Sequence, residues 1–219
     1  MSSPPTVTDY LTAIGALLGG GGALVAGIAA YRALNTWRAQ LNGQARFDVA
    51  KRLLTGAHDL AEKFHSARSR GIVESRLAAV LANPQASAGQ KAGEYVMAFD
   101  ARWEPVRACG AYMVGLIPEA NALLCGDIAN AADALLDSVY RLRASMDEFV
   151  SYVRDFGMGG ADADESTEVR SEWVRVRKDV YSYDPRRNPE ADNPLTQEFV
   201  ERHETLVKLL RPHVERPGN

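Results

Sequence analysis

After residue 46, apolar residues recur at intervals of three and four, which is the spacing of helices with one buried face. The first stripe consists of Phe47, Ala50, Leu54, Ala57, Ala61 and Phe64. A further helix is predicted over residues 91–116, with a kink at Pro105. Its inward face is expected to hold Tyr95, Phe99, Trp103, Val106 and Met113.

The most regular stripe lies in a helix predicted from Pro118 to Phe156, with a break near Gly126. Its members are Ile128, Ala131, Leu135, Val139, Leu142, Met146, Phe149 and Val153. Two shorter helices follow, one after residue 167 and one over residues 195–210. Their inward residues are Val169, Trp173, Val176 and Val180 in the first, and Phe199, His203, Leu206 and Leu210 in the second. With almost no strand pattern, the chain is predicted to be all-α, an N-terminal transmembrane helix followed by a bundle of four to six helices.

The segment from Tyr10 to Tyr31 differs from the rest because its 22 residues carry no charged side chain. As a helix it would extend roughly 33 Å, enough to cross a hydrocarbon core of about 30 Å. Its four consecutive glycines weaken a helix in water, but in lipid a single segment satisfies its backbone only as a helix. A tyrosine at each end suits the membrane interface. We therefore predict a transmembrane helix over residues 10–31.

Three other interpretations of this segment compete with a membrane span. A phosphate-binding loop fails, because GALLGGGGAL has no Lys for the phosphates and no Ser or Thr for magnesium. A cleaved signal peptide is the main rival, since Ala29 and Ala30 suit a cleavage site, yet a basic n-region is missing and the apolar run is long. A buried helix of a soluble domain is the third.

The small residues of the segment follow a pattern of their own. Gly15, Gly19, Ala23 and Gly27 recur at every fourth position, so they share one face of a helix. Such a face lets two membrane helices approach closely and pack through their backbones. We therefore predict a homo-oligomer, or an assembly with a partner membrane protein, formed through these four residues.

The distribution of charge predicts how the span is oriented. The chain has a formal net charge of −3, which gives no general case for nucleic acid as a partner. Residues 1–31 carry only Asp9, whereas residues 32–76 hold nine basic and four acidic residues. The basic flank behind the span consists of Arg32, Arg38, Arg46, Lys51 and Arg52. Because such a flank stays in the cytoplasm and attracts anionic lipid, we predict a single-pass protein of the bacterial inner membrane with its N-terminus outside and its C-terminal domain cytoplasmic.

Candidate chemistry is sparse. His58, Glu62 and His65 can share one helix face, and Glu62-x-x-His65 has the spacing of di-iron helix bundles. The second Glu-x-x-His motif of such a site is missing, so surface side chains are the favoured interpretation and no cofactor is predicted. Cys109 and Cys125 are expected to be buried free thiols in a reducing compartment.

Two further motifs are interpreted as structural. Asp162, Asp164 and Ser166 resemble the start of a calcium loop, but Thr167 and Trp173 stand where Gly and Glu are required, so helix capping is expected. The segment Asp184-Pro-Arg-Arg is interpreted as a solvated basic turn rather than a phosphate or lipid site.

An N-terminal span followed by TWRAQLNGQARFDVAKRLL, RWEPVRACGAY and FVERHETLVKLLRPHV resembles a group of uncharacterised bacterial single-pass membrane proteins. Trp37, Leu41 and Gly43 match a shared Trp-x-x-x-Leu-x-Gly start. Ala50, Leu53 and Leu54 match an Ala-x-x-Leu-Leu stretch. The resemblance implies a bacterial membrane protein with a cytoplasmic helical domain, and it implies no catalytic residue.

The predicted organisation is a tail over residues 1–9, the span over 10–31, a main helical bundle over 32–156, an acidic linker over 157–167 and C-terminal helices over 168–219. The leading hypothesis is a membrane-anchored assembly protein without catalysis. A membrane-perturbing or pore-forming effector of a bacterial defence or toxin system is the first alternative. A membrane-tethered enzyme or metal protein centred on His58, Glu62 and His65 is the second.

Overall fold

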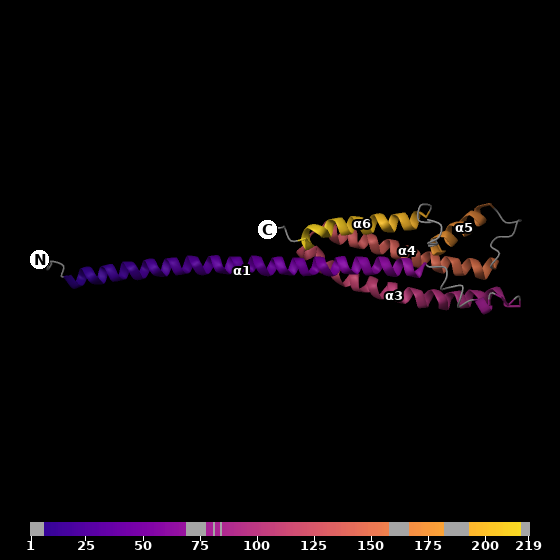
Figure 1. Ribbon diagram of the computed structural model, residues 1–219, viewed down its shortest axis with the longest axis horizontal. Coiled ribbons are helices and arrows are strands. Elements are labelled where there is room, and N and C mark those ends of the chain that lie inside the picture. The colour runs from indigo at the N-terminus through magenta and orange to yellow at the C-terminus, as the bar shows by residue number, and fades with distance from the viewer. Residues whose placement is uncertain are drawn as a thin grey trace. The chain divides into compact units, whose positions relative to one another are not determined.

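The computed structural model describes residues 7–68, 78–80, 82–83, 85–157, 167–181 and 193–215, with the side chains of residues 9–25 left out. Within these ranges the regular structure is helical throughout, which confirms the all-α prediction. The long helices are α1 (Val7–Ala67), α3 (Ala88–Leu123), α4 (Gly126–Phe156), α5 (Thr167–Tyr181) and α6 (Pro194–Val214) (Figure 1). Residues 158–166 of the predicted acidic linker and the Asp184 turn lie outside the described residues.

The chain divides into two compact units, Met1–Ala45 and Arg46–Asn219, and α1 contributes residues to both. In the first unit the side chains from residue 26 to residue 44 are all exposed. Among the residues that the structure describes, no helical stretch is both apolar and long enough to span a membrane. Most of the predicted span lies outside that search, because the side chains of residues 9–25 are not described. The span therefore stays a prediction.

In the second unit, α4 is the central helix and packs against α3, α5 and α6. Its buried face is the regular stripe predicted from the sequence, in which only Ala131 is half-buried rather than buried. The predicted inward faces of α5 and α6 are also confirmed at Trp173, Val176, Val180, Phe199, Leu206 and Leu210. The α4 helix ends at Gly157, whose φ of 74° is one that glycine adopts without strain.

The buried face of α1 differs in detail from the predicted stripe. Leu53 and Leu60 are fully buried, whereas Leu54 and Ala61, which were predicted to face inward, are half-buried. The buried face of α1 is thus rotated slightly from the predicted stripe, toward Leu53 and Leu60 and away from Leu54 and Ala61. The resulting core residues of α1 are Val49, Ala50, Leu53, Ala57, Leu60, Phe64 and Ala67.

Prolines do not set the ends of α3, which corrects the predicted boundaries. The helix runs from Ala88 to Leu123 and contains both Pro105 and Pro118, so Pro118 does not begin the next helix. A proline in a helix interior costs roughly 3 kcal/mol. Burial of Leu116 and Ala120 on either side of Pro118 continues the apolar face and offsets that cost. The α3 helix begins at Ser87, which forms a capping box with Gln90.

Candidate functional site

The part of α1 before Arg46 presents large apolar side chains to solvent. Tyr31, Leu34, Trp37 and Leu41 are all exposed, and Trp37 has 61% of its surface accessible. Leu34, Trp37 and Leu41 are separated by three and four residues, which is the seam spacing of a coiled coil. At 3.6 residues per turn, Gly27 falls on the same side of the helix as this seam. We call Gly27, Leu34, Trp37 and Leu41 the α1 seam.

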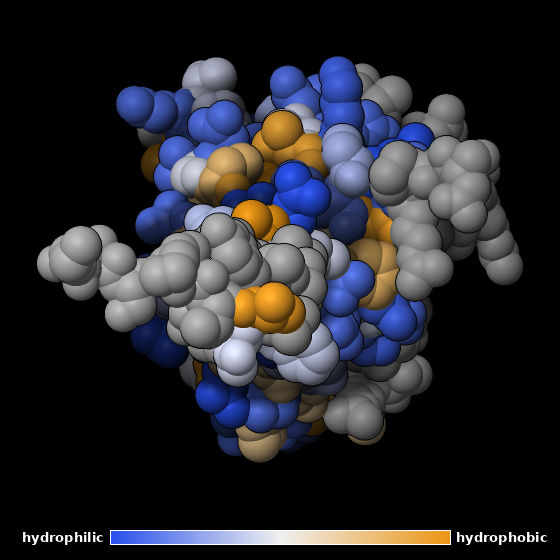
Figure 2. All heavy atoms as spheres, turned by 90° about the vertical axis from the view of Figure 1, so that its left-hand side faces the viewer, coloured by the Kyte–Doolittle hydropathy of each residue, from blue (hydrophilic) through white to orange (hydrophobic). Residues whose placement is uncertain are grey.

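Exposed apolar residues elsewhere show no such regularity. Those of the second unit are scattered over α3, α4 and α5: Met97, Tyr112, Val114, Tyr140, Phe156 and Val174. In the view of Figure 2, hydrophilic residues cover much of the coloured surface and hydrophobic residues form small separate areas. Scattered apolar residues are normal on a protein surface, whereas an ordered row on a helix indicates a binding face.

The predicted small-residue face is described only at its last member. Gly15, Gly19 and Ala23 lie where the side chains are not described, although the backbone there is part of α1. Gly27 is exposed, and a Cβ atom built on it would meet no atom within 4 Å. Its surroundings therefore leave room for another backbone to approach, as the prediction requires.

The basic flank is exposed, but one of its members has a partner inside the fold. Arg32, Arg38, Arg46 and Lys51 are all exposed. Arg52 is exposed as well, and it forms a surface ion pair with Glu119 of α3. The guanidinium of Arg52 therefore bridges two helices, a role that the sequence did not indicate because the two residues lie 67 positions apart.

Three histidines meet where α1 packs against α6. The rings of His58 and His203 lie 5.1 Å apart between centroids, in an edge-to-face arrangement. His65 approaches the ring of Phe199 at 6.0 Å, and Phe199 stacks on Phe64 at 3.9 Å. We call His58, His65 and His203 the histidine cluster.

This arrangement does not make the predicted trio of His58, Glu62 and His65 a metal centre. Within the described residues, no group of three or more His, Cys, Asp or Glu side chains is placed to hold a metal ion. Glu62 is bound to Lys63 through a 2.8 Å ion pair, which lowers the pKa of the Glu62 carboxyl. Within the described residues His58, Glu62 and His65 are therefore not placed together as metal ligands, and the metal-protein alternative stays an untested prediction.

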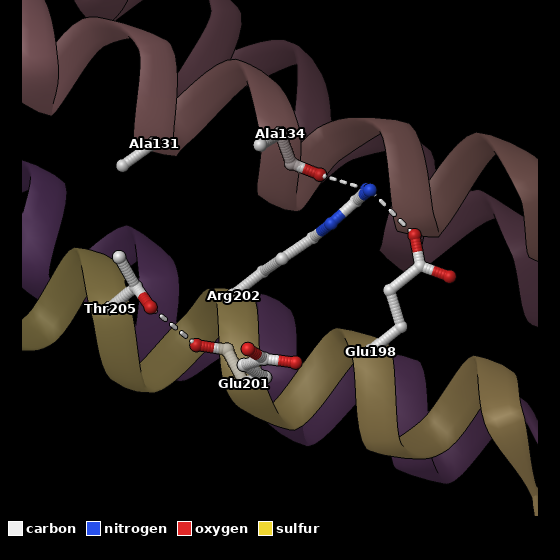
Figure 3. A pocket seen from close by; sticks show the side chains of 6 residues that line it. All are labelled: Ala131, Ala134, Glu198, Glu201, Arg202 and Thr205. Atoms are coloured by element: carbon white, nitrogen blue, oxygen red, sulfur yellow. Dashed lines mark hydrogen bonds and ion pairs between the residues drawn. The ribbon is translucent and has the colours of Figure 1, made fainter.

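An open groove of about 310 Å³ lies between α4 and α6 (Figure 3). Arg202 crosses it, donating to the carbonyl oxygen of Ala134 at 2.7 Å and pairing with Glu198 at 2.6 Å. The space exists because Ala131 and Ala134 present only methyl groups there. Arg202 is the cation that lines this groove, and it is already bound to Ala134 and Glu198. The groove is therefore best explained as an ion-paired contact between α4 and α6.

A second polar network joins α4 and α5, and sequence patterns did not reveal it. Arg175 pairs with Glu148 at 3.0 Å, with Glu172 at 2.6 Å and with Asp179 at 3.1 Å. The carboxylates of Glu172 and, to a lesser extent, Glu148 raise the pKa of the Arg175 guanidinium. The buried Asp179 carboxylate also accepts a hydrogen bond from Ser145 Oγ at 3.3 Å. The network orients α5 on α4.

The two cysteines do not match the predicted pair of buried thiols. Cys109 is half-buried and donates weakly to the Gly56 carbonyl at 3.6 Å, and burial raises the pKa of its thiol. Cys125 is exposed at the start of α4. The sequence placed Cys125 inside a helix, whereas it lies at the α3–α4 junction, where the chain turns and side chains reach solvent.

Comparison with protein-family models, with curated proteins and with solved structures finds no match to this chain. The resemblance to bacterial single-pass membrane proteins therefore stays a prediction. The class of protein defined by the fold is an all-α helical bundle.

Proposed function

We propose that this protein is a membrane-anchored helical assembly protein of the bacterial inner membrane that pairs with a second copy of itself along α1. The observation that carries the proposal is the α1 seam, in which the exposed side chains of Leu34, Trp37 and Leu41 lie on the same helix side as the open position at Gly27. By helical periodicity, the small-residue positions 15, 19 and 23 share that side. One helix face would therefore pair the two copies both within the membrane and in the segment that follows it.

The composition of this stretch supports the need for a partner. Residues 35–44 include Asn35, Thr36, Asn42 and Gly43, which are weak helix formers in water. Isolated helices shorter than about 12–15 residues are only marginally stable in water, and most helices in proteins depend on packing of an apolar face. Pairing two α1 helices would bury the leucines and Trp37 and would stabilise the helix in the segment that leads to the bundle.

The anchor is supported by the uncharged Tyr10–Tyr31 segment and by the exposed cations that follow it. Anchoring raises the effective concentration of the domains, so even a weak contact between two copies becomes populated. Arg32 and Arg38 lie within reach of anionic headgroups if residue 31 is at the interface.

Disulfide crosslinking in native membranes tests this proposal. In a chain carrying Cys109→Ser and Cys125→Ser, Leu34→Cys should give covalent dimers, whereas Ala39→Cys, on the opposite side of the helix, should give few. Adding Leu41→Glu should remove most of the crosslinked product, because it places like charges in the seam. Ala39→Glu is the matched control and should leave the yield unchanged. Equal crosslinking from positions 34 and 39, or unchanged oligomers with Gly19→Leu and Ala23→Leu, would contradict the proposal.

A further inference from the structure

The histidine cluster brings together three of the four histidines of the chain. Two of them, His58 and His65, lie on α1, and His203 comes from α6, more than 130 positions further along the chain. Between them the stacked rings of Phe64 and Phe199 form the buried contact of the two helices. A group of titratable rings thus borders the apolar contact that holds α6 on α1.

His203 is the member of the cluster with a buried ring nitrogen, Nε2, that lacks a hydrogen-bond partner among the described residues. Its ring is nearly parallel to that of Phe199, at an interplanar angle of 10°. A proton added to this ring would create a cation next to an aromatic contact, with no buried acceptor for its N–H group.

The groups around His203 also disfavour its protonation. Burial, followed by the neighbouring His58, lowers the pKa of His203, and His65 acts in the same direction. Glu204, on the same helix as His203, opposes the shift. Arg202 is directed toward α4, where it binds the Ala134 carbonyl and Ser138 Oγ at 3.0 Å. The neutral form of His203 is therefore the form that fits the folded contact.

We propose that the histidine cluster is an acid-sensitive latch, in which protonation of His203 releases α6 from α1. Protonated His203 would hold its charge 5.1 Å from the His58 ring, with a buried N–H group that has no acceptor among the described residues. Since the unfolded chain takes up the proton at its ordinary pKa of 6.5, the latch is fully closed above that pH and weakens as the pH falls below it. The latch lies in the second unit and does not depend on the pairing of α1.

Hydrogen–deuterium exchange on the full chain in detergent tests the latch. Peptides from α6 should exchange at least about threefold faster at pH 5.5 than at pH 7.5, after correction for the intrinsic rate, while α3 peptides stay unchanged. His203→Phe, which preserves the stack on Phe199, should remove this pH dependence. His213→Gln alters the fourth histidine, in the last turn of α6, and should leave it intact.

His58→Gln offers an independent check that does not disturb a buried group. Without the repulsion from His58, His203 takes up a proton more readily, so the midpoint of the transition should move to higher pH. All samples contain EDTA, so that a bound metal ion does not contribute. Equal α6 protection at both pH values, a pH dependence that survives His203→Phe, or a midpoint unmoved by His58→Gln would overturn the proposal. If His203→Phe does not fold, the pH profile of α6 exchange in the wild type and the direction in which His58→Gln moves its midpoint still decide whether the latch exists.

Discussion

Arg68 joins the ends of three helices through one buried side chain. Only 1% of its surface is exposed, at the C-terminal end of α1. Its Nε atom donates to the Asp179 carbonyl at 2.8 Å, and another guanidinium nitrogen donates to Thr196 Oγ1. The Asp179 carbonyl belongs to the last turn of α5, where a cation is favoured and a carbonyl lacks a partner within its own helix. A residue that looks like surface charge in the sequence thus acts as a C-cap for a distant helix.

Replacing Arg68 should lower the free energy of unfolding. Arg68→Met keeps much of the side-chain volume but leaves the α5 carbonyl and the Thr196 hydroxyl without their donor. We expect the free energy of unfolding to fall by about 2–4 kcal/mol. Urea denaturation in detergent, followed by circular dichroism, measures the change.

Arg170→Met is the matched control, because Arg170 is exposed on α5. It should change the free energy of unfolding by no more than about 0.5 kcal/mol. Equal effects of the two substitutions would show that the capping role assigned to Arg68 is incorrect.

At the scale of single elements, α1 shows how one helix serves two purposes. From Val49 to Ala67 its apolar residues pack into the core of the second unit, whereas its earlier apolar residues are exposed. The close approach of α1 to α3 depends on Gly56 of α1. A Cβ atom there would lie 3.1 Å from Met113 Cγ and 3.4 Å from Tyr112 Cε1. Gly93 of α3 faces open space instead, with no atom within 4 Å of its Cβ position.

The two glycines should therefore respond in opposite ways to the same substitution. Gly56→Leu forces α1 and α3 apart, and we expect it to lower the free energy of unfolding by about 1–3 kcal/mol. Gly93→Leu replaces an exposed helical glycine with a strong helix former and should raise it by about 0.5–1 kcal/mol. Thermal unfolding of both variants measures the difference, and a destabilised Gly93→Leu or a neutral Gly56→Leu would refute this account of the packing.

At the scale of the whole molecule, the proposed orientation depends on charge beside the span. Arg32, Arg38 and Arg46 are exposed and lie within 15 residues of Tyr31. Positive residues so close to a span hold their side of the protein in the cytoplasm, whereas charges far along the chain have little influence.

Reversing these charges should disturb the orientation. In a variant with Arg32→Glu, Arg38→Glu and Arg46→Glu, the fraction of chains with a cytoplasmic C-terminus should fall by about half or more. A C-terminal fluorescent reporter that matures only in the cytoplasm measures this fraction. Arg154→Glu, Arg170→Glu and Arg177→Glu, all exposed and far from the span, form the control and should have no effect. If the full chain stays in the supernatant after ultracentrifugation without detergent, the membrane anchor itself is ruled out.

The sequence by itself determined which segments are helical and which faces of α4, α5 and α6 are buried. This was possible because an amphipathic helix places its apolar residues at a local, regular spacing that depends only on nearby positions. The same reasoning placed the break near Gly126 and the helix end at Phe156 correctly, but it misjudged Pro118, since local propensity does not include the packing of Leu116 and Ala120.

Only the tertiary structure decided how distant residues meet. The contact of His58 with His203, the capping of α5 by Arg68 and the Arg52–Glu119 ion pair each join positions more than 60 residues apart. It also decided between adjacent candidates, placing Leu53 rather than Leu54 in the core. Such contacts depend on how helices are rotated and shifted against each other, and many sequences with the same periodicity allow several such arrangements.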